Sequence, residues 1–219
     1  MPPVTTIGII GGTGPEGKGL AYRFALAAHE VLIGSRSAER GEEAAREIAE
    51  HASASNVRGG ANLDVARDAE IVILTVPYVA QAETLPPLAE ACAGKVVVST
   101  GVPLSLDGGK PAMLAVPEGS AAEQAQARLP KARVVAAFQN LAAAKLWDSD
   151  APLEQDVIVC ADDADAKREI MALAEQIAGA RAVDGGALAG SRYVEGITVL
   201  LIAINRRYKT TAGVRIVGV

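Results

Sequence analysis

Residues 5–20 read TTIGIIGGTGPEGKGL, and this stretch joins an apolar strand to a glycine-rich turn and then to a helix. The β-branched run ends at Ile10, and the turn contains the pattern GxGxxG from Gly12 to Gly17. Glycines at these places permit a tight turn, close approach of the backbone to a pyrophosphate, and close helix-to-strand packing. The strand before the pattern and the helix after it predict dinucleotide binding, with a purely structural turn as the alternative.

The end of the second expected strand decides which dinucleotide fits. Enzymes that use NAD commonly carry Asp or Glu there, to hold the ribose 2′-hydroxyl. This chain instead has Gly34, Ser35 and Arg36, with Arg40 one helical turn further on. A serine hydroxyl and two guanidinium groups suit a 2′-phosphate, so the sequence favours NADP(H). The alternative is that the two arginines form a solvated helix edge beside neighbouring glutamates.

Strands and helices alternate along the whole chain, as in repeated βαβ units. We expect strands at residues 5–10, 30–33, near 57, 71–76, 95–99, 133–138, 156–160 and 180–183. We expect helices at residues 15–28, 38–51, 64–68, 79–92, 121–129, 141–147, 164–177 and 191–206. Pro86 and Pro87 should kink or break the helix at 79–92, and Ser120 with Glu123 forms a capping box.

This alternation predicts an α/β fold, with a Rossmann-type, doubly wound and mostly parallel sheet and a small C-terminal α/β appendage. We expect residues 1–140 to form the NADP-binding core. Residues 141–219 should form a smaller substrate-binding portion packed on it. The proline- and glycine-rich segment 101–119 is long for a connection inside a compact domain, which is typical of a lid or binding loop.

Composition narrows the partners and the location. The formal charge is −5 over 219 residues and no stretch gathers five or more Lys or Arg residues, which argues against a nucleic-acid partner. The longest apolar run, 197–204, is shorter than the roughly 20 residues that a membrane span needs. No signal-like segment opens the chain, so we expect a cytoplasmic protein without a membrane partner. Cys92 and Cys160 lack any ligand spacing, which favours buried thiols over a disulfide or a metal site.

The expected helix 191–206 is apolar almost all round, so it should be buried on most sides. A subunit interface can bury part of such a helix, and we expect a homodimer.

In an open α/β sheet the ligand lies beyond the carboxyl ends of the strands, here residues 75–78, 99–104 and 139–143. Those stretches contain no His, Asp or Glu, and His29 and His51 fall at the opposite rim. An alcohol dehydrogenase needs a placed base or a metal, and only Lys145 lies near enough to serve. A second redox cofactor would need less from the protein, because hydride then passes between two stacked rings.

These residues resemble the F420H2:NADP oxidoreductase family over nearly the whole chain. The resemblance rests on the glycine-rich turn continued to Leu20, on Gly34-Ser35-Arg36, Thr75-Val76-Pro77-Tyr78 and Val102-Pro103, and on Ser191-Arg192-x-Val194-Glu195-x-x-Thr198. It implies reversible hydride exchange between NADP(H) and the deazaflavin coenzyme F420, a small-molecule redox co-substrate. The turn and the resemblance together give the expected NADP(H)-binding residues: Gly12, Thr13, Gly14, Pro15, Glu16, Gly17, Ser35, Arg36, Arg40, Tyr78, Ala82, Leu104 and Ala143.

The resemblance also implies that Arg192 and Thr198 position the deazaflavin, although Arg192 could instead pair with Glu195. Gln139 and Asn140 are expected to bind substrate. Gln139 replaces a histidine of some family members, so it can hydrogen-bond a ring carbonyl but cannot carry charge. Near the C-terminus, the basic segment 206–209 with Ala212 and Gly213 is expected to hold the anionic tail or to be a solvated helix end.

Two other functions remain open at this stage. One is a non-catalytic NADP-sensing domain, and the other is an NADPH-dependent reductase of another small substrate, such as an imine or a ferric chelate.

Overall fold

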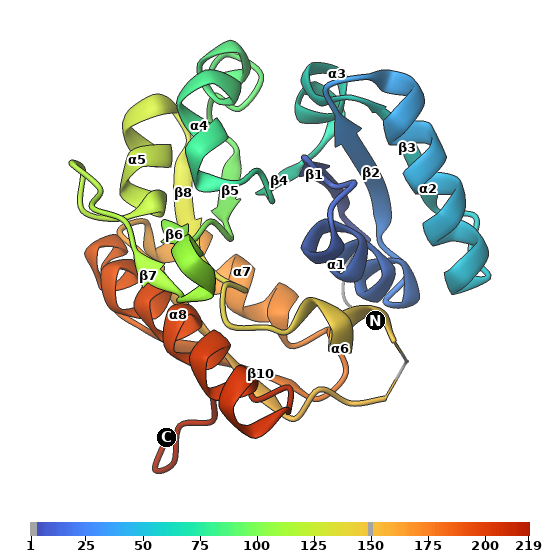
Figure 1. The fold of residues 1–219 in the computed structure, drawn as a ribbon. Helices are drawn as coiled ribbons and strands as arrows, with labels where there is room; N and C mark the ends of the chain where they lie inside the picture. The colour runs from blue at the N-terminus through green and yellow to red at the C-terminus, as the bar shows by residue number, and fades with distance from the viewer. Residues whose placement is uncertain (1–3, 149–150) are drawn as a thin grey trace.

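The computed structural model describes residues 4–148 and 151–219 (Figure 1). Residues 1–3 of the expected core portion and residues 149–150 of the expected C-terminal portion lie outside the described residues. The main feature is an eight-stranded sheet with the order β10-β9-β8-β5-β4-β1-β2-β3. Its strands are β1 (Thr6–Ile10), β2 (Glu30–Ser35), β3 (Val57–Ala61), β4 (Ile71–Leu74), β5 (Val96–Ser99), β8 (Arg133–Ala136), β9 (Gln155–Ala161) and β10 (Ala180–Asp184).

Neighbouring strands of this sheet run parallel except for the pair β8–β9, which is antiparallel. The strand order reverses beside β1, as in a doubly wound nucleotide-binding fold. The predicted Rossmann-type, mostly parallel sheet is therefore confirmed. The two C-terminal strands continue the same sheet beyond β8.

Helices cover both faces of the sheet, because alternate strand residues point to opposite sides. Ile7 and Ile9 of β1 belong to the core under α1, α2, α6 and α7, whereas Ile10 belongs to the core under α3, η1, α5 and α8. The helices are α1 (Pro15–Leu26), α2 (Ala38–Ala52), α3 (Asn62–Asp68), α4 (Tyr78–Thr84), η1 (Pro86–Leu88), α5 (Ala121–Arg128), α6 (Ala143–Trp147), α7 (Ala164–Ala174), η3 (Leu188–Gly190) and α8 (Ser191–Tyr208).

The structure confirms the predicted break at the two prolines and adds detail to the segment 101–119. The helix expected at 79–92 ends at Thr84, and a 3-10 turn follows at the two prolines, which cannot supply helical N–H groups. The segment 101–119 forms a hairpin of β6 (Leu104–Ser105) and β7 (Ala112–Met113) around the turn η2 (Asp107–Gly109). This hairpin contacts α8 (Figure 1).

Helix α8 is less buried within one chain than its composition predicts. Ser191, Val194, Glu195 and Leu201 are buried, but Tyr193 is 79% exposed and Leu200 is 59% exposed. By length and composition alone the segment Leu188–Tyr208 could cross a membrane, and a core helix can pass the same test. An apolar face of α8 is therefore left uncovered by the chain itself.

Candidate active site

The glycine-rich turn forms the floor of the site. A Cβ at Gly17 would lie 2.6 Å from Gly12 Cα, and a Cβ at Gly12 would lie 2.8 Å from the Ile9 carbonyl oxygen. These two glycines are therefore required for α1 to pack on β1. A Cβ at Gly14 would meet no atom within 4 Å, so the space above Gly14 is open to a ligand. This space lies at the N-terminal end of α1, where unpaired N–H groups favour a pyrophosphate.

On one side of the turn lies the arginine cavity, about 260 Å³ in volume, which Thr13, Ser35, Arg36 and Arg40 line with residues of α4. Ser35 is buried at the end of β2, whereas both arginines are exposed. Within residues 4–148 and 151–219, neither guanidinium group has an ion-pair partner. The cavity thus offers a hydroxyl and two guanidinium groups against the single carboxylate of Glu83, a net positive lining that suits a phosphate.

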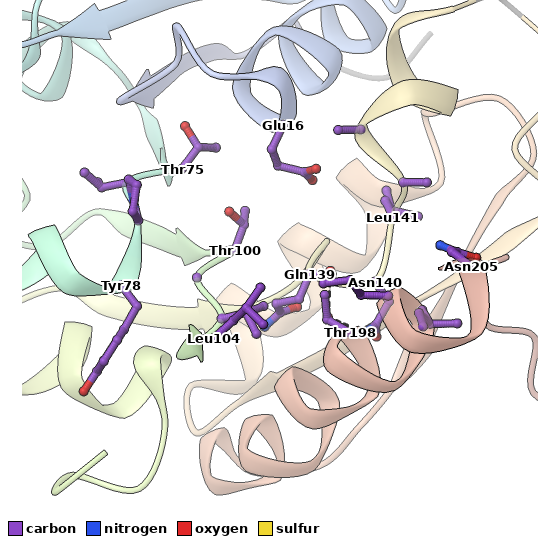
Figure 2. A pocket seen from close by; sticks show the side chains of 18 of the residues that line it. Glu16, Thr75, Tyr78, Thr100, Leu104, Gln139, Asn140, Leu141, Thr198 and Asn205 are labelled. Carbon is purple, nitrogen blue, oxygen red and sulfur yellow. Dashed lines mark hydrogen bonds between the residues drawn. The ribbon is translucent and has the colours of Figure 1, made fainter. Parts of the chain in front are cut away.

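On the other side of the turn lies the central cavity, about 410 Å³ in volume. It is lined by residues of the three predicted strand ends, namely Thr75, Val76, Pro77, Tyr78, Thr100, Gly101, Val102, Leu104, Gln139, Asn140, Leu141, Ala142 and Ala143. Glu16 from α1 and residues of α8 and the segment after it complete the wall: Thr198, Leu201, Ile202, Asn205 and Ala212. The expected ligand site at the carboxyl ends of the strands is therefore present as a cavity (Figure 2).

The turn after β8 aims an amide into the central cavity. Phe138 adopts the left-handed conformation with φ 71°, which is costly for a bulky residue and fixes the direction of the chain at Gln139. The Gln139 side chain is buried, and neither its Nε2 nor its Oε1 has a partner within the described residues. A buried amide without a partner favours a ligand that donates to it or accepts from it.

Thr198 is held at the rim of this cavity by two hydrogen bonds. Its Oγ1 donates to the Gln139 carbonyl oxygen at 2.9 Å and accepts from Asn140 Nδ2 at 2.9 Å. Asn140 Nδ2 also donates to the Val194 carbonyl oxygen at 3.0 Å. These bonds join α8 to the end of β8, so they fix the wall that faces the turn.

Glu16 lines the central cavity from outside the three strand ends. Figure 2 shows it extending from α1 into the cavity, between Thr75 and Leu141. Its Oε1 is buried without a partner within the described residues, and burial raises the pKa of Glu16 to about 8. The three strand ends contain no acid, as the sequence shows, so the acid in this cavity comes from the glycine-rich turn and α1. The signal was available, because the fifth position of GxGxxG begins the helix that faces the strand ends.

Arg192 lies outside the central cavity. Its guanidinium group donates to both carboxylate oxygens of Glu123, at 2.8 and 2.6 Å, rather than to Glu195. This pairing with Arg192 lowers the pKa of Glu123. Glu195 is buried and accepts the backbone N–H groups of Ala121 and Ala122 at 2.9 and 3.1 Å.

Ser120 forms the predicted cap, because its Oγ accepts from the Glu123 N–H at 3.0 Å. Ser191 Oγ in turn lies 2.8 Å from Ser120 Oγ. The Ser191-Arg192-x-Val194-Glu195 motif therefore docks α8 on the N-terminus of α5, an arrangement that we call the α5–α8 clamp. Its members are Ser120, Glu123, Ser191, Arg192 and Glu195.

The remaining predicted residues spread over several places. Pro15 lines a third cavity with Thr13 and Ala143, and Ala82 is exposed on α4 outside these three cavities. Ala212 lines both the central cavity and a fourth one, of about 210 Å³, that we call the C-terminal cavity. Its walls are Lys145, Leu153, Glu154, Gln155, Thr211, Ala212, Gly213, Val214 and Arg215. From the basic segment, Arg206 donates to the Gly109 carbonyl oxygen.

Neither histidine lines the central cavity, and both contact other parts of the fold. His29 is buried, accepts from the Thr5 N–H at 3.2 Å and hydrogen-bonds Gln176 Oε1 at 2.8 Å. His51 stacks on Trp147 with ring centroids 4.3 Å apart. Cys92 and Cys160 are free and buried, and burial raises the pKa of Cys160 to about 11.

Comparison with known proteins identifies close relatives. Residues 6–103 match the family model described as NADP oxidoreductase, coenzyme F420-dependent. The F420-dependent NADP reductase of Methanocaldococcus jannaschii is 44% identical, and the match covers 96% of this chain and 97% of that protein. The F420-dependent NADP reductase of Methanothermobacter marburgensis is 42% identical, with the same coverage of 96% and 97%.

Solved structures agree on the fold. A putative F420-dependent NADP reductase from Arthrobacter sp. FB24 superposes with a TM-score of 0.81 at 27% identity, covering 94% of this chain and 96% of that one. An imine reductase from Bacillus cereus superposes with a TM-score of 0.63 at 18% identity, covering 93% of this chain and 62% of that one. The second similarity is one of fold alone.

Proposed function

Because this chain belongs to the F420-dependent NADP reductase family, we propose that it is an NADP-dependent oxidoreductase that transfers a hydride reversibly between NADP(H) and the deazaflavin coenzyme F420. The single observation that carries the proposal is the pair of cavities on either side of one phosphate-binding turn. The arginine cavity suits a phosphorylated adenosine. The central cavity suits two stacked rings, because its walls are largely apolar and its free polar groups are few.

NADP(H) would lie across the glycine-rich turn. The open space above Gly14 receives the pyrophosphate, and the N-terminus of α1 supplies N–H donors. Ser35, Arg36 and Arg40 hold the 2′-phosphate, and the absence of an ion pair to either arginine among the described residues supports this role. Tyr78, Leu104 and Ala143 line the cavity into which the nicotinamide extends.

The deazaflavin would occupy the part of the central cavity next to α8. Gln139 offers its free amide to a ring carbonyl, while Thr198 and Asn140 fix the wall behind it. The two cofactors supply the hydride chemistry when bound, so the protein has to orient the rings and exclude water. Residues 141–219 contribute the α8 side chains to this side of the cavity, which supports their role as a substrate-binding portion.

The anionic tail of F420 would leave the central cavity at Ala212 and enter the C-terminal cavity beside Gly213. Lys145 and Arg215 line that cavity and can hold negative charge. Arg192 would act indirectly, through the α5–α8 clamp.

The proposal includes a homodimer in the cytoplasm. The exposed apolar side chains of α8, Tyr193 and Leu200, support a second copy as the covering partner. The free buried cysteines suit a reducing compartment. Sedimentation of the purified protein tests the dimer, because a monomer at micromolar concentration would contradict it.

The function is tested by mixing the purified protein with NADPH and oxidised F420 and following the visible absorbance of the deazaflavin. We expect the absorbance to fade with NADPH and to recover when excess NADP⁺ is added. Tight NADPH binding without turnover would contradict the proposal and favour an NADP sensor. Turnover with a cyclic imine but not with F420 would favour a reductase of another substrate.

A further inference from the structure

Glu16 places an acid in the cavity that the two rings would share. Its side chain extends from the first turn of α1 into the central cavity (Figure 2), and Oε1 is buried without a partner within residues 4–148 and 151–219. Among the described residues that line this cavity, Tyr78 is the only other ionisable one. A buried polar atom without a partner is costly, so its retention in a cavity points to a ligand group that it meets.

The geometry of the turn indicates which end of the dinucleotide lies near Glu16. A pyrophosphate above Gly14 leaves one nucleoside on each side of the turn. The arginine cavity on one side suits the 2′-phosphate, and its wall continues into the central cavity through Val76 and Pro77, which line both. The nicotinamide therefore falls on the side of Glu16. This step rests on the proposed function.

The two oxidation states of the nicotinamide differ in charge, since the ring is a cation in NADP⁺ and neutral in NADPH. We infer that Glu16 is a specificity-determining residue that selects between these states. Its carboxylate attracts the cationic ring of NADP⁺, whereas its neutral acid form suits NADPH. When NADP⁺ binds to the protonated acid, one proton leaves the carboxyl group for solvent. When NADPH binds, the proton stays.

Both protonation states of Glu16 are accessible near neutral pH, because burial raises its pKa to about 8. Other charged groups on nearby elements pair with other residues or line other cavities. Lys18 on α1 pairs with Glu47, Glu83 after the first turn of α4 lines the arginine cavity, Lys145 on α6 lines the C-terminal cavity, and Arg206 on α8 donates to Gly109. Burial is accordingly the one cause found for the raised pKa of Glu16.

The test compares dissociation constants for NADP⁺ and NADPH between pH 7 and pH 9.5. Both nucleotides carry the same phosphates, so titration of the phosphates cancels in the ratio of the two constants. We expect the ratio Kd(NADP⁺)/Kd(NADPH) of the wild-type protein to fall about tenfold across this range as Glu16 ionises. In Glu16→Gln the ratio should stay constant. The matched control Glu90→Gln removes a carboxylate that is 83% exposed and pairs with Lys131, and it should behave as wild type.

Calorimetry of the wild-type protein gives a second readout that needs no variant. In buffers of different ionisation enthalpy at pH 7.5, NADP⁺ binding should release more protons than NADPH binding, by a fraction approaching one. A constant ratio in the wild-type protein, equal proton release, or a ratio in Glu16→Gln that still falls would overturn the inference. Failure of both nucleotides to bind would instead overturn the proposed function, so the two failures are distinguishable.

Discussion

At the scale of single residues, we propose that Arg36 and Arg40 decide cofactor choice. Both line the arginine cavity with Ser35, and no described carboxylate pairs with either guanidinium group. Charge-assisted hydrogen bonds to a phosphate contribute about 1.5 to 3 kcal/mol each. We predict that the double variant Arg36→Gln, Arg40→Gln weakens NADPH binding about a hundredfold and NADH binding less than about threefold. Fluorescence titration with each nucleotide measures both constants.

The matched control for this prediction is Arg58→Gln. Arg58 is exposed and its nearest acid is Glu30, 3.7 Å away, so its removal should leave both nucleotides unaffected. Equal losses for NADPH and NADH in the double variant would show that the arginines do not read the 2′-phosphate.

Single residues also show how much of the candidate site could be predicted from the sequence. Ser35 and Arg36 could be predicted to share a site, because both follow a strand whose end must face the turn. Gln139 could be predicted to face the ligand for the same reason. Glu16 was expected at the nucleotide only as part of the glycine-rich turn. The burial of its Oε1 could not be predicted, because it depends on cavity walls that Leu141 and α8 supply from distant parts of the chain.

At the scale of elements, the α5–α8 clamp determines where α8 can lie. Glu195 satisfies two buried N–H groups of α5, so removing its carboxylate leaves both without an acceptor. We predict that Glu195→Ala lowers the free energy of unfolding by about 2 to 4 kcal/mol. Urea denaturation followed by circular dichroism measures this loss. Arg207→Ala, an exposed change on the same helix, should cost less than about 0.5 kcal/mol. A Glu195→Ala variant as stable as this control would refute the clamp.

The α5–α8 clamp also shows why the contacts of a motif cannot be predicted from its spacing alone. The spacing from Ser191 to Thr198 predicts a helix, and it says nothing of what packs against each side. Only the folded chain places Arg192 against Glu123 and leaves Thr198 at the cavity rim. By contrast, Ser120 and Pro86 act through the local backbone, so the cap and the helix break were predictable from the sequence.

At the scale of the whole molecule, Asp156 holds the C-terminal segment against the sheet. Its carboxylate accepts from Arg181 at 2.9 and 2.7 Å and from the Ile216 N–H at 2.5 Å. The pairing with Arg181 lowers the pKa of Asp156 below its usual 3.8. Its stabilising contribution is therefore complete above about pH 3.8 and is lost as the pH falls through the lower native value.

We predict that Asp156→Asn costs about 1 to 2 kcal/mol of unfolding free energy at pH 7, because an exposed arginine partner limits the gain. The difference from wild type should shrink as the pH falls below 3.8. Unfolding curves at a series of pH values measure it. A difference that stays constant down to the acid transition would rule out the ionised pair as the cause.

At this scale, the sequence predicts which strands occur but not how the C-terminal strands join the sheet. The sequence shows that strands occur near residues 156–160 and 180–183, because apolar runs alternate with a helix. It does not show that β9 joins β8 antiparallel, since that edge is chosen by packing between distant residues. The same limit applies to α8, because the exposure of Tyr193 and Leu200 depends on how the rest of the chain packs against this helix.

The central claim is direct hydride transfer between NADP(H) and F420 in the central cavity. It is tested most directly with the two C4-deuterated stereoisomers of NADPH, each mixed with the protein and oxidised F420 in ordinary water. We predict that one isomer delivers its deuterium to the reduced deazaflavin, as measured by mass spectrometry, and that the other delivers none. Reduced F420 without deuterium from either isomer, or no reduced F420 at all, would contradict the account.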